Sequence, residues 1–119
     1  MRQEASKFRH AFNGFIALIR SEPHFRFHLV AAVIVIAAGF YFDVSRGEWV
    51  ALCLAIMAVL VAEAINTSIE HLTDVVHPEF HERAGKVKDI ASASVLLAAT
   101  GATVVGVVVF YDDVIGLFS

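Results

Sequence analysis

The sequence is poor in charged residues and cysteine, and it lacks the common nucleotide-binding motifs. Charged residues make up 18% of the 119 residues, against about a quarter in soluble domains, so most of the surface must face lipid or other subunits. Cys53 is the single cysteine, which excludes an internal disulfide. The patterns Gly-x-x-x-x-Gly-Lys, Gly-x-Gly-x-x-Gly and Cys-x-x-Cys do not occur, which excludes the commonest nucleotide and zinc signatures.

What the sequence does contain is long apolar runs. Hydrophobic residues make up 58% of the chain and the mean hydropathy is +0.71, and both values are too high for an ordinary soluble domain. We expect an all-α membrane protein in which residues 1–119 form a single integral-membrane domain. Its transmembrane helices are predicted at about residues 27–42, 49–72 and 90–111.

Before the first predicted span, residues 2–21 alternate basic and apolar side chains with helical spacing. Phe8, Phe12 and Phe15 can share one broad face, with basic side chains around its edges. This pattern predicts an amphipathic surface helix that lies in the membrane interface. The alternative is a helix that packs on the protein's own membrane bundle. In either case Pro23 and the two residues before it should end the helix.

The positive residues predict how the chain crosses the membrane. With three spans, the N-terminus and the 73–89 loop lie on the same side. All but Arg46 of the nine Lys and Arg residues belong to that side. Positive residues concentrate in cytoplasmic segments. We therefore expect a multi-pass protein of the bacterial inner membrane, with a cytoplasmic N-terminus and the C-terminus outside.

A stripe of polar residues runs along the second predicted span. Glu63, Asn66, Glu70 and Asp74 interrupt an otherwise apolar sequence. On an α-helix they fall within roughly 80° of one another, along a stripe about 16 Å long. A carboxylate inside a hydrophobic helix is costly unless it faces a partner, water or a ligand. The stripe indicates a bound cation; the alternative is a polar seam between helices, which Asn or Ser would form at lower cost.

The surroundings of the stripe suit phosphoryl transfer. Carboxylates without thiolates suit a hard cation such as Mg²⁺, which takes its remaining ligands from water and phosphates. The Lys and Arg side chains of the 77–89 loop suit the phosphates themselves. Glu63 lies at membrane depth and suits a general base that acts on a lipid hydroxyl. Together these features predict phosphate transfer from a soluble nucleotide to an alcohol held in the membrane.

The stripe also resembles the signature of a known family. The motif Glu63-Ala-Ile-Asn66-Thr-Ser-Ile-Glu70-x-x-x-Asp74 is similar to that of the small prokaryotic diacylglycerol kinases. The resemblance covers nearly the whole chain and includes these further segments: Phe12-Asn13-Gly14, Glu22, Glu79-Phe80-His81 and Gly85-Lys-Val-Lys88-Asp89. Asn13-Gly14 and Glu22-x-x-Phe25-x-x-His28 are more similar to the undecaprenol kinase branch, because the diacylglycerol kinase branch usually has Glu where this chain has His28.

The resemblance implies an ATP- and Mg²⁺-dependent lipid kinase that forms a homotrimeric bundle with active sites shared between subunits. The lipid alcohol is undecaprenol, converted to undecaprenyl phosphate, or alternatively diacylglycerol, converted to phosphatidic acid. Carried over by position, Glu63 is the general base and contacts the substrate, Asn66 orients the reacting groups, and Glu22 and Glu70 are the metal ligands. Ser92 contacts the lipid, and the ATP contacts are His10, Glu22, Glu70, Glu79, His81, Lys88 and Asp89. His10 and Phe80 stand where the diacylglycerol kinase branch often has Tyr, so two tyrosine hydroxyls are missing here.

Two other functions remain open. A small proton-coupled transporter would use Glu63 as its carrier carboxylate. That function does not explain Glu70, Asn66 and the basic loop at one end of the stripe. A non-catalytic assembly protein would use the small residues that recur every four positions along the third predicted span, namely Ser94, Ala98, Ala102 and Gly106. No nucleic-acid partner is expected.

Overall fold

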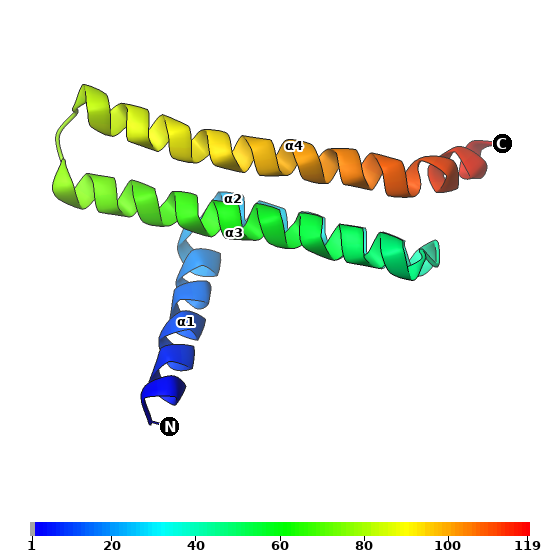
Figure 1. Ribbon diagram of the computed structural model, residues 1–119, viewed down its shortest axis with the longest axis horizontal. Helices are drawn as coiled ribbons and strands as arrows, with labels where there is room; N and C mark the ends of the chain where they lie inside the picture. The colour runs from blue at the N-terminus through cyan, green and yellow to red at the C-terminus, as the bar shows by residue number, and fades with distance from the viewer. Residues whose placement is uncertain (1) are drawn as a thin grey trace.

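The computed structural model describes residues 2–119, which form four α-helices (Figure 1). Helix α1 spans Arg2–Ser21, α2 spans Pro23–Tyr41, α3 spans Arg46–Val76 and α4 spans Glu82–Phe118. No strand occurs among these described residues. The prediction of an all-α chain is confirmed, and the first helix has the predicted bounds.

Helices α2, α3 and α4 are each long and apolar enough to cross a membrane. Helix α3 has 31 residues and α4 has 37, so at about 1.5 Å per residue both exceed the roughly 30 Å of a bilayer's hydrocarbon core. Helices α3 and α4 extend beyond the predicted spans at both ends. Helix α2 starts before its predicted span but ends at Tyr41, one residue before the predicted limit. The polar ends of α3 and α4 are therefore long enough to reach beyond the hydrocarbon.

The first turn of α3 is fixed by a capping box. The Ser45 hydroxyl accepts from the backbone N–H of Glu48 at 3.2 Å, and the Ser45 N–H donates to the Glu48 carboxylate at 3.0 Å. These bonds satisfy donors that a helix start otherwise leaves free. The polar turn after the first span is consequently short, because the residues from Arg46 onward already belong to α3.

The connection between α3 and α4 is also short. Helix α3 ends at Val76, directly before His77-Pro78, as the proline predicts. Helix α4 begins at Glu82, because the Nδ1 atom of His81 accepts from the backbone N–H of Arg83 at 3.2 Å and caps the helix start. Residues 77–89, which the sequence predicts as a polar loop or part-helix, are therefore helical from Glu82 onward, and only residues 77–81 are not.

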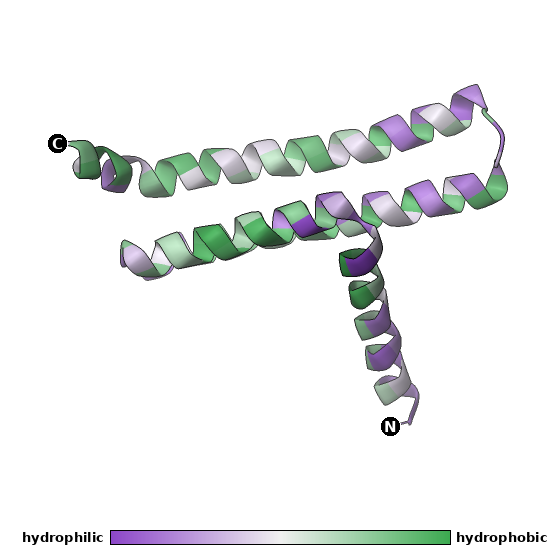
Figure 2. Cartoon of the chain, turned by 180° about the vertical axis from the view of Figure 1, so that it is seen from behind, coloured by the Kyte–Doolittle hydropathy of each residue, from purple (hydrophilic) through white to green (hydrophobic). Residues whose placement is uncertain are grey.

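Helices α3 and α4 lie side by side, while α2 packs on α3 and α1 leaves the bundle at a steep angle (Figure 1). Helix α1 has no buried residue, and its Phe8 and Phe12 side chains are 78% and 64% exposed. It is anchored to the bundle at its C-terminal end, where Phe15 meets the buried Phe25 edge to face with ring centroids 5.7 Å apart. Polar residues gather on α1 and around the α3–α4 connection (Figure 2).

A cluster of buried apolar residues lies at the end of the bundle opposite the α3–α4 connection (Figure 1). Val44, Leu52 and Val109 form a buried cluster that joins the turn before α3 to α3 and α4. Beside it, the indole of Trp49 covers Gly39, where an added Cβ would lie only 2.6 Å from the ring. Glycine is therefore required at this close contact between α2 and α3. The cluster holds this end of the bundle together, whereas residues 77–81 at the polar end are all exposed.

Candidate active site

The predicted stripe lies along one helix, α3, and its deep end, Glu63 and Asn66, faces the interior. Glu63 and Asn66 are 5% and 8% exposed, and Thr67 beside them is also buried. Glu70, one turn further, is half-buried, and Asp74 is exposed. Exposure therefore increases along the stripe toward the α3–α4 connection, so the stripe leads from the interior of the bundle to its polar end.

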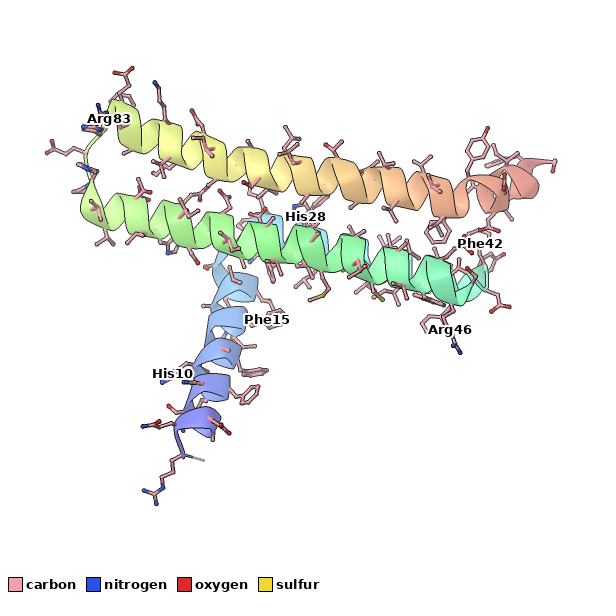
Figure 3. The ribbon with its side chains drawn as sticks, in the orientation of Figure 1. His10, Phe15, His28, Phe42, Arg46 and Arg83 are labelled. Atoms are coloured by element: carbon pink, nitrogen blue, oxygen red, sulfur yellow. The ribbon has the colours of Figure 1, made fainter. Side chains whose placement is uncertain are left out.

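Glu63 has a partner on another helix. The Nε2 atom of His28, on α2, lies 3.7 Å from Oε2 of Glu63. Both side chains are largely buried, with 17% and 7% of their surface exposed. Figure 3 places His28 at mid-length of the bundle beside α3. His28 is not among the site residues that the sequence predicts. The signal that could identify it is a histidine at the start of an apolar run, since ionisable residues in such runs are usually functional.

Asn66 holds Glu70 in place and leaves one atom without a partner. Its Nδ2 atom donates to Oε1 of Glu70 at 3.2 Å. A carboxylate only accepts, so the amide must turn its NH₂ group toward Glu70. The Oδ1 atom of Asn66 is then buried and finds no hydrogen-bond donor within residues 2–119. An acceptor of this kind is costly unless another group or a ligand satisfies it.

Glu22 reaches α3 from the junction between α1 and α2. Its Oε1 atom lies 3.4 Å from Nε2 of His71, the residue after Glu70. The fold thus places Glu22 beside His71, the residue that follows the other predicted metal ligand, Glu70, on α3. Within residues 2–119 no three His, Cys, Asp or Glu side chains gather as a metal-binding cluster. Two carboxylates nevertheless fit Mg²⁺, which keeps several waters and takes further ligands from substrate phosphates.

The predicted nucleotide residues meet at the polar end of the bundle. A pocket of about 300 Å³ lies between the end of α3 and the start of α4, and Glu79, His81, Lys88 and Asp89 all line it. The Lys88 ammonium is paired with the carboxylate of Asp74, the last residue of the stripe. The rings of His77 and His81 stack with centroids 4.8 Å apart. The pocket therefore adjoins the exposed end of the stripe.

Two predicted contacts lie elsewhere. His10 is on the projecting helix α1, away from the pocket (Figure 3). Ser92 is exposed on α4 and does not line the pocket. Their roles stay predictions, as do the roles of the other site residues.

Comparisons with known proteins match this region. The family model of prokaryotic diacylglycerol kinase matches residues 9–110, which include every candidate residue of the stripe and the pocket. The chain is 34% identical over 103 residues to the undecaprenol kinase of Bacillus subtilis (strain 168), covering 87% of this chain and 84% of the relative. It is 36% identical over 91 residues to the diacylglycerol kinase of Pseudomonas aeruginosa, covering 76% and 74%. Over 89 residues it is 33% identical to the diacylglycerol kinase of Escherichia coli (strain K12), covering 75% and 73%.

Proposed function

Because this chain belongs to the prokaryotic diacylglycerol kinase family, whose members are lipid kinases, we propose that it transfers the γ-phosphate of ATP to undecaprenol, giving undecaprenyl phosphate. The observation that carries this proposal is the buried pair Glu63 and Asn66 on a membrane helix, on a stripe that ends beside the Lys88 pocket. The alternative substrate is diacylglycerol, which would give phosphatidic acid by the same mechanism. Relatives of both names match this chain at similar identity.

The proposed setting is the bacterial inner membrane. The N-terminus and the α3–α4 connection face the cytoplasm and the C-terminus lies outside, because all Lys and Arg residues except Arg46 lie on the proposed cytoplasmic side. Helix α1 lies in the membrane interface, where the exposed rings of Phe8 and Phe12 enter the lipid. We propose that residues 1–119 act as one domain of a homotrimer with active sites shared between subunits. The exposed apolar side chains of α3 and α4, such as Val61 and Leu97, support contacts with lipid and with neighbouring subunits.

ATP enters the pocket between α3 and α4 from the cytoplasm. Glu79, His81 and Asp89 contact the nucleotide, and Lys88 exchanges its partner Asp74 for a phosphate oxygen. His10 would contact the nucleotide and Ser92 the lipid in a site shared between subunits. Glu22 and Glu70 would hold Mg²⁺, which neutralises charge on the β- and γ-phosphates when bound. Asn66 keeps the Glu70 carboxylate oriented.

The lipid alcohol reaches Glu63 from the cytoplasmic leaflet. Glu63 accepts the hydroxyl proton as the alcohol oxygen forms a bond to the γ-phosphorus. The bond between the γ-phosphorus and the bridging oxygen of ADP breaks in line with this attack, and no phosphoenzyme forms. Lys88 offsets the negative charge that develops on the transferred group.

Incubating the purified protein with radiolabelled ATP and each lipid in turn, with and without Mg²⁺, tests the proposal. We expect label in undecaprenyl phosphate only when Mg²⁺ is present. Label in phosphatidic acid alone would select the alternative substrate. Absence of label from every lipid, together with proton movement that is independent of ATP, would favour a transporter instead.

A further inference from the structure

The junction between α1 and α2 holds the backbone of Glu22 in a fixed place. The Glu22 N–H donates to the carbonyl oxygen of Leu18 in α1 at 3.0 Å. The guanidinium of Arg26, in α2, donates to the carbonyl oxygens of Ile19 and Arg20 at 2.8 and 3.0 Å. These bonds satisfy acceptors that the end of a helix otherwise leaves free. Because the bonds tie α1 to α2 on both sides of Glu22, they fix the point from which its side chain extends.

The side chain of Glu22 is not held by its own helix. Glu22 is the N-cap residue of α2, with an extended backbone (φ −115°, ψ 103°), yet its carboxylate forms no cap hydrogen bond with the first turn. An N-cap side chain usually accepts such a bond. The carboxylate instead reaches α3, where its Oε1 atom lies 3.4 Å from Nε2 of His71, and the Glu22 side chain is only 21% exposed. The contact with α3 therefore determines where the carboxylate lies.

His71 and Asn66 make matching contacts with the two predicted metal ligands. Asn66 donates to Oε1 of Glu70, and His71 faces Oε1 of Glu22. The second oxygen of each carboxylate, Oε2, has no hydrogen bond within residues 2–119. His71 directly follows Glu70, so it holds Glu22 at nearly the same height along α3, since one residue adds about 1.5 Å. Carboxylates that bind a metal are usually held by hydrogen bonds of their own.

We propose that His71 is a positioning residue for the metal site. Its imidazole N–H holds one oxygen of Glu22 and leaves the other oxygen for the ion that Glu70 also binds. The inference rests on the proposed kinase function, in which Glu22 and Glu70 hold Mg²⁺. His71 touches neither the ion nor the reacting atoms, so its effect passes through Glu22. Loss of a partner of this kind typically costs about 10- to 100-fold in metal affinity.

Direct metal binding tests the proposal. The probe is Mn²⁺, which carboxylates bind as they bind Mg²⁺ and whose free form gives an EPR signal. The purified protein in detergent is titrated with Mn²⁺ alone, without nucleotide, so that only protein ligands are measured. We expect His71→Leu to raise the Kd for Mn²⁺ about 10-fold or more. His71→Gln keeps an N–H donor and should restore most of the loss.

The matched control is His24→Leu. His24 is exposed at the start of α2 and belongs to none of the ion pairs among residues 2–119. The Kd of this variant for Mn²⁺ should stay within about twofold of the wild type. The side chain of His71 is 68% exposed, so the thermal unfolding of His71→Leu should match that of the wild type as well.

Two further measurements separate positioning from other roles. Glu22→Gln removes the carboxylate through which His71 acts, so adding His71→Leu to that variant should change the Kd by less than about twofold. In the kinase assay, His71→Leu should raise the Mg²⁺ concentration that gives half the maximal rate about 10-fold or more. Its kcat at saturating Mg²⁺ should stay within about twofold of the wild type, because the reacting groups are unchanged.

The outcomes separate this inference from the proposed function. Equal Kd values for Mn²⁺ in His71→Leu and His24→Leu would overturn the positioning role alone. A loss that persists in full in the Glu22→Gln background would show that His71 does not act through Glu22, and would overturn that role too. A wild type that binds Mn²⁺ no better than a variant with both Glu22→Gln and Glu70→Gln would overturn the metal assignment, and this inference with it. A wild type that shows the expected Mn²⁺ binding but labels no lipid would overturn the kinase function and leave the positioning of Glu22 in place.

Discussion

Replacing Asn66 by leucine should weaken the metal site without weakening the fold. The substitution removes the hydrogen bond of 3.2 Å to Glu70, and a bond to a charged group contributes about 1.5–3 kcal/mol. It also removes the buried Oδ1 atom, which has no donor within residues 2–119. Removing such an unsatisfied acceptor should raise the free energy of unfolding by about 1–3 kcal/mol. The two contributions have opposite signs and similar sizes. We therefore expect the free energy of unfolding to stay within about 1 kcal/mol of the wild type.

Magnesium dependence should change much more. Removing the partner that orients a metal ligand typically costs about 10- to 100-fold in metal affinity. In Asn66→Leu, the Mg²⁺ concentration that gives half the maximal rate should rise by that factor. The assay is the initial rate of lipid phosphorylation at saturating ATP and lipid as Mg²⁺ is varied. Thermal unfolding of the same preparation in detergent micelles reports the stability.

The matched control is Ser68→Ala on the same helix. Ser68 is exposed and its hydroxyl donates only to the backbone oxygen of Ala64. This change should therefore alter neither the Mg²⁺ titration nor the thermal unfolding curve. An unchanged Mg²⁺ titration in Asn66→Leu would refute the idea that Asn66 orients a metal ligand. A large loss of stability would show instead that Asn66 is a structural link between helices.

Further predictions concern the ion pair and the packing. Lys88→Met should raise KM for ATP about 10-fold, whereas Asp74→Asn, which releases Lys88, should leave KM unchanged or lower; KM values that rise equally would contradict this. Because both groups are partly or largely exposed, neither change should alter the unfolding free energy by more than about 1 kcal/mol. Gly39→Ala should destabilise the bundle by about 1–3 kcal/mol, because its Cβ would lie 2.6 Å from the Trp49 ring, and an unchanged Tm in detergent would contradict that packing. Ser45→Ala should cost about 0.5–2 kcal/mol through loss of the helix cap, measured in the same way.

The helices and several of their ends could be predicted from the sequence, but the starts of α3 and α4 could not. Apolar runs indicate membrane helices, and Pro23 and Pro78 mark where two of the breaks fall. The predicted spans depend on the apolar residues alone. Helix α3 starts at the polar residue Arg46 because the Ser45 cap supports it, and α4 starts at Glu82 because His81 caps it. Such capping bonds extend helices into polar sequence, where hydropathy gives no signal.

The stripe could be predicted because it depends on a single helix. The 3.6-residue repeat of α3 suffices to align Glu63 with the stripe's other members. The partners across helices could not be predicted in the same way. The contacts of Glu63 with His28 and of Glu22 with His71 depend on how α2 is rotated and shifted against α3. Side-chain packing between the helices determines this rotation and shift. The spacing of residues within one helix does not reveal them.

The central claim is that Glu63 removes the proton from the lipid hydroxyl while the other acids hold the magnesium nucleotide. The most direct measurement is single-turnover phosphate transfer from ATP to undecaprenol by Glu63→Gln, with Mg²⁺-ATP binding measured on the same sample. The proposed mechanism predicts binding equal to that of the wild type and a transfer rate lower by about 100-fold or more. Transfer at a rate close to that of the wild type would contradict it.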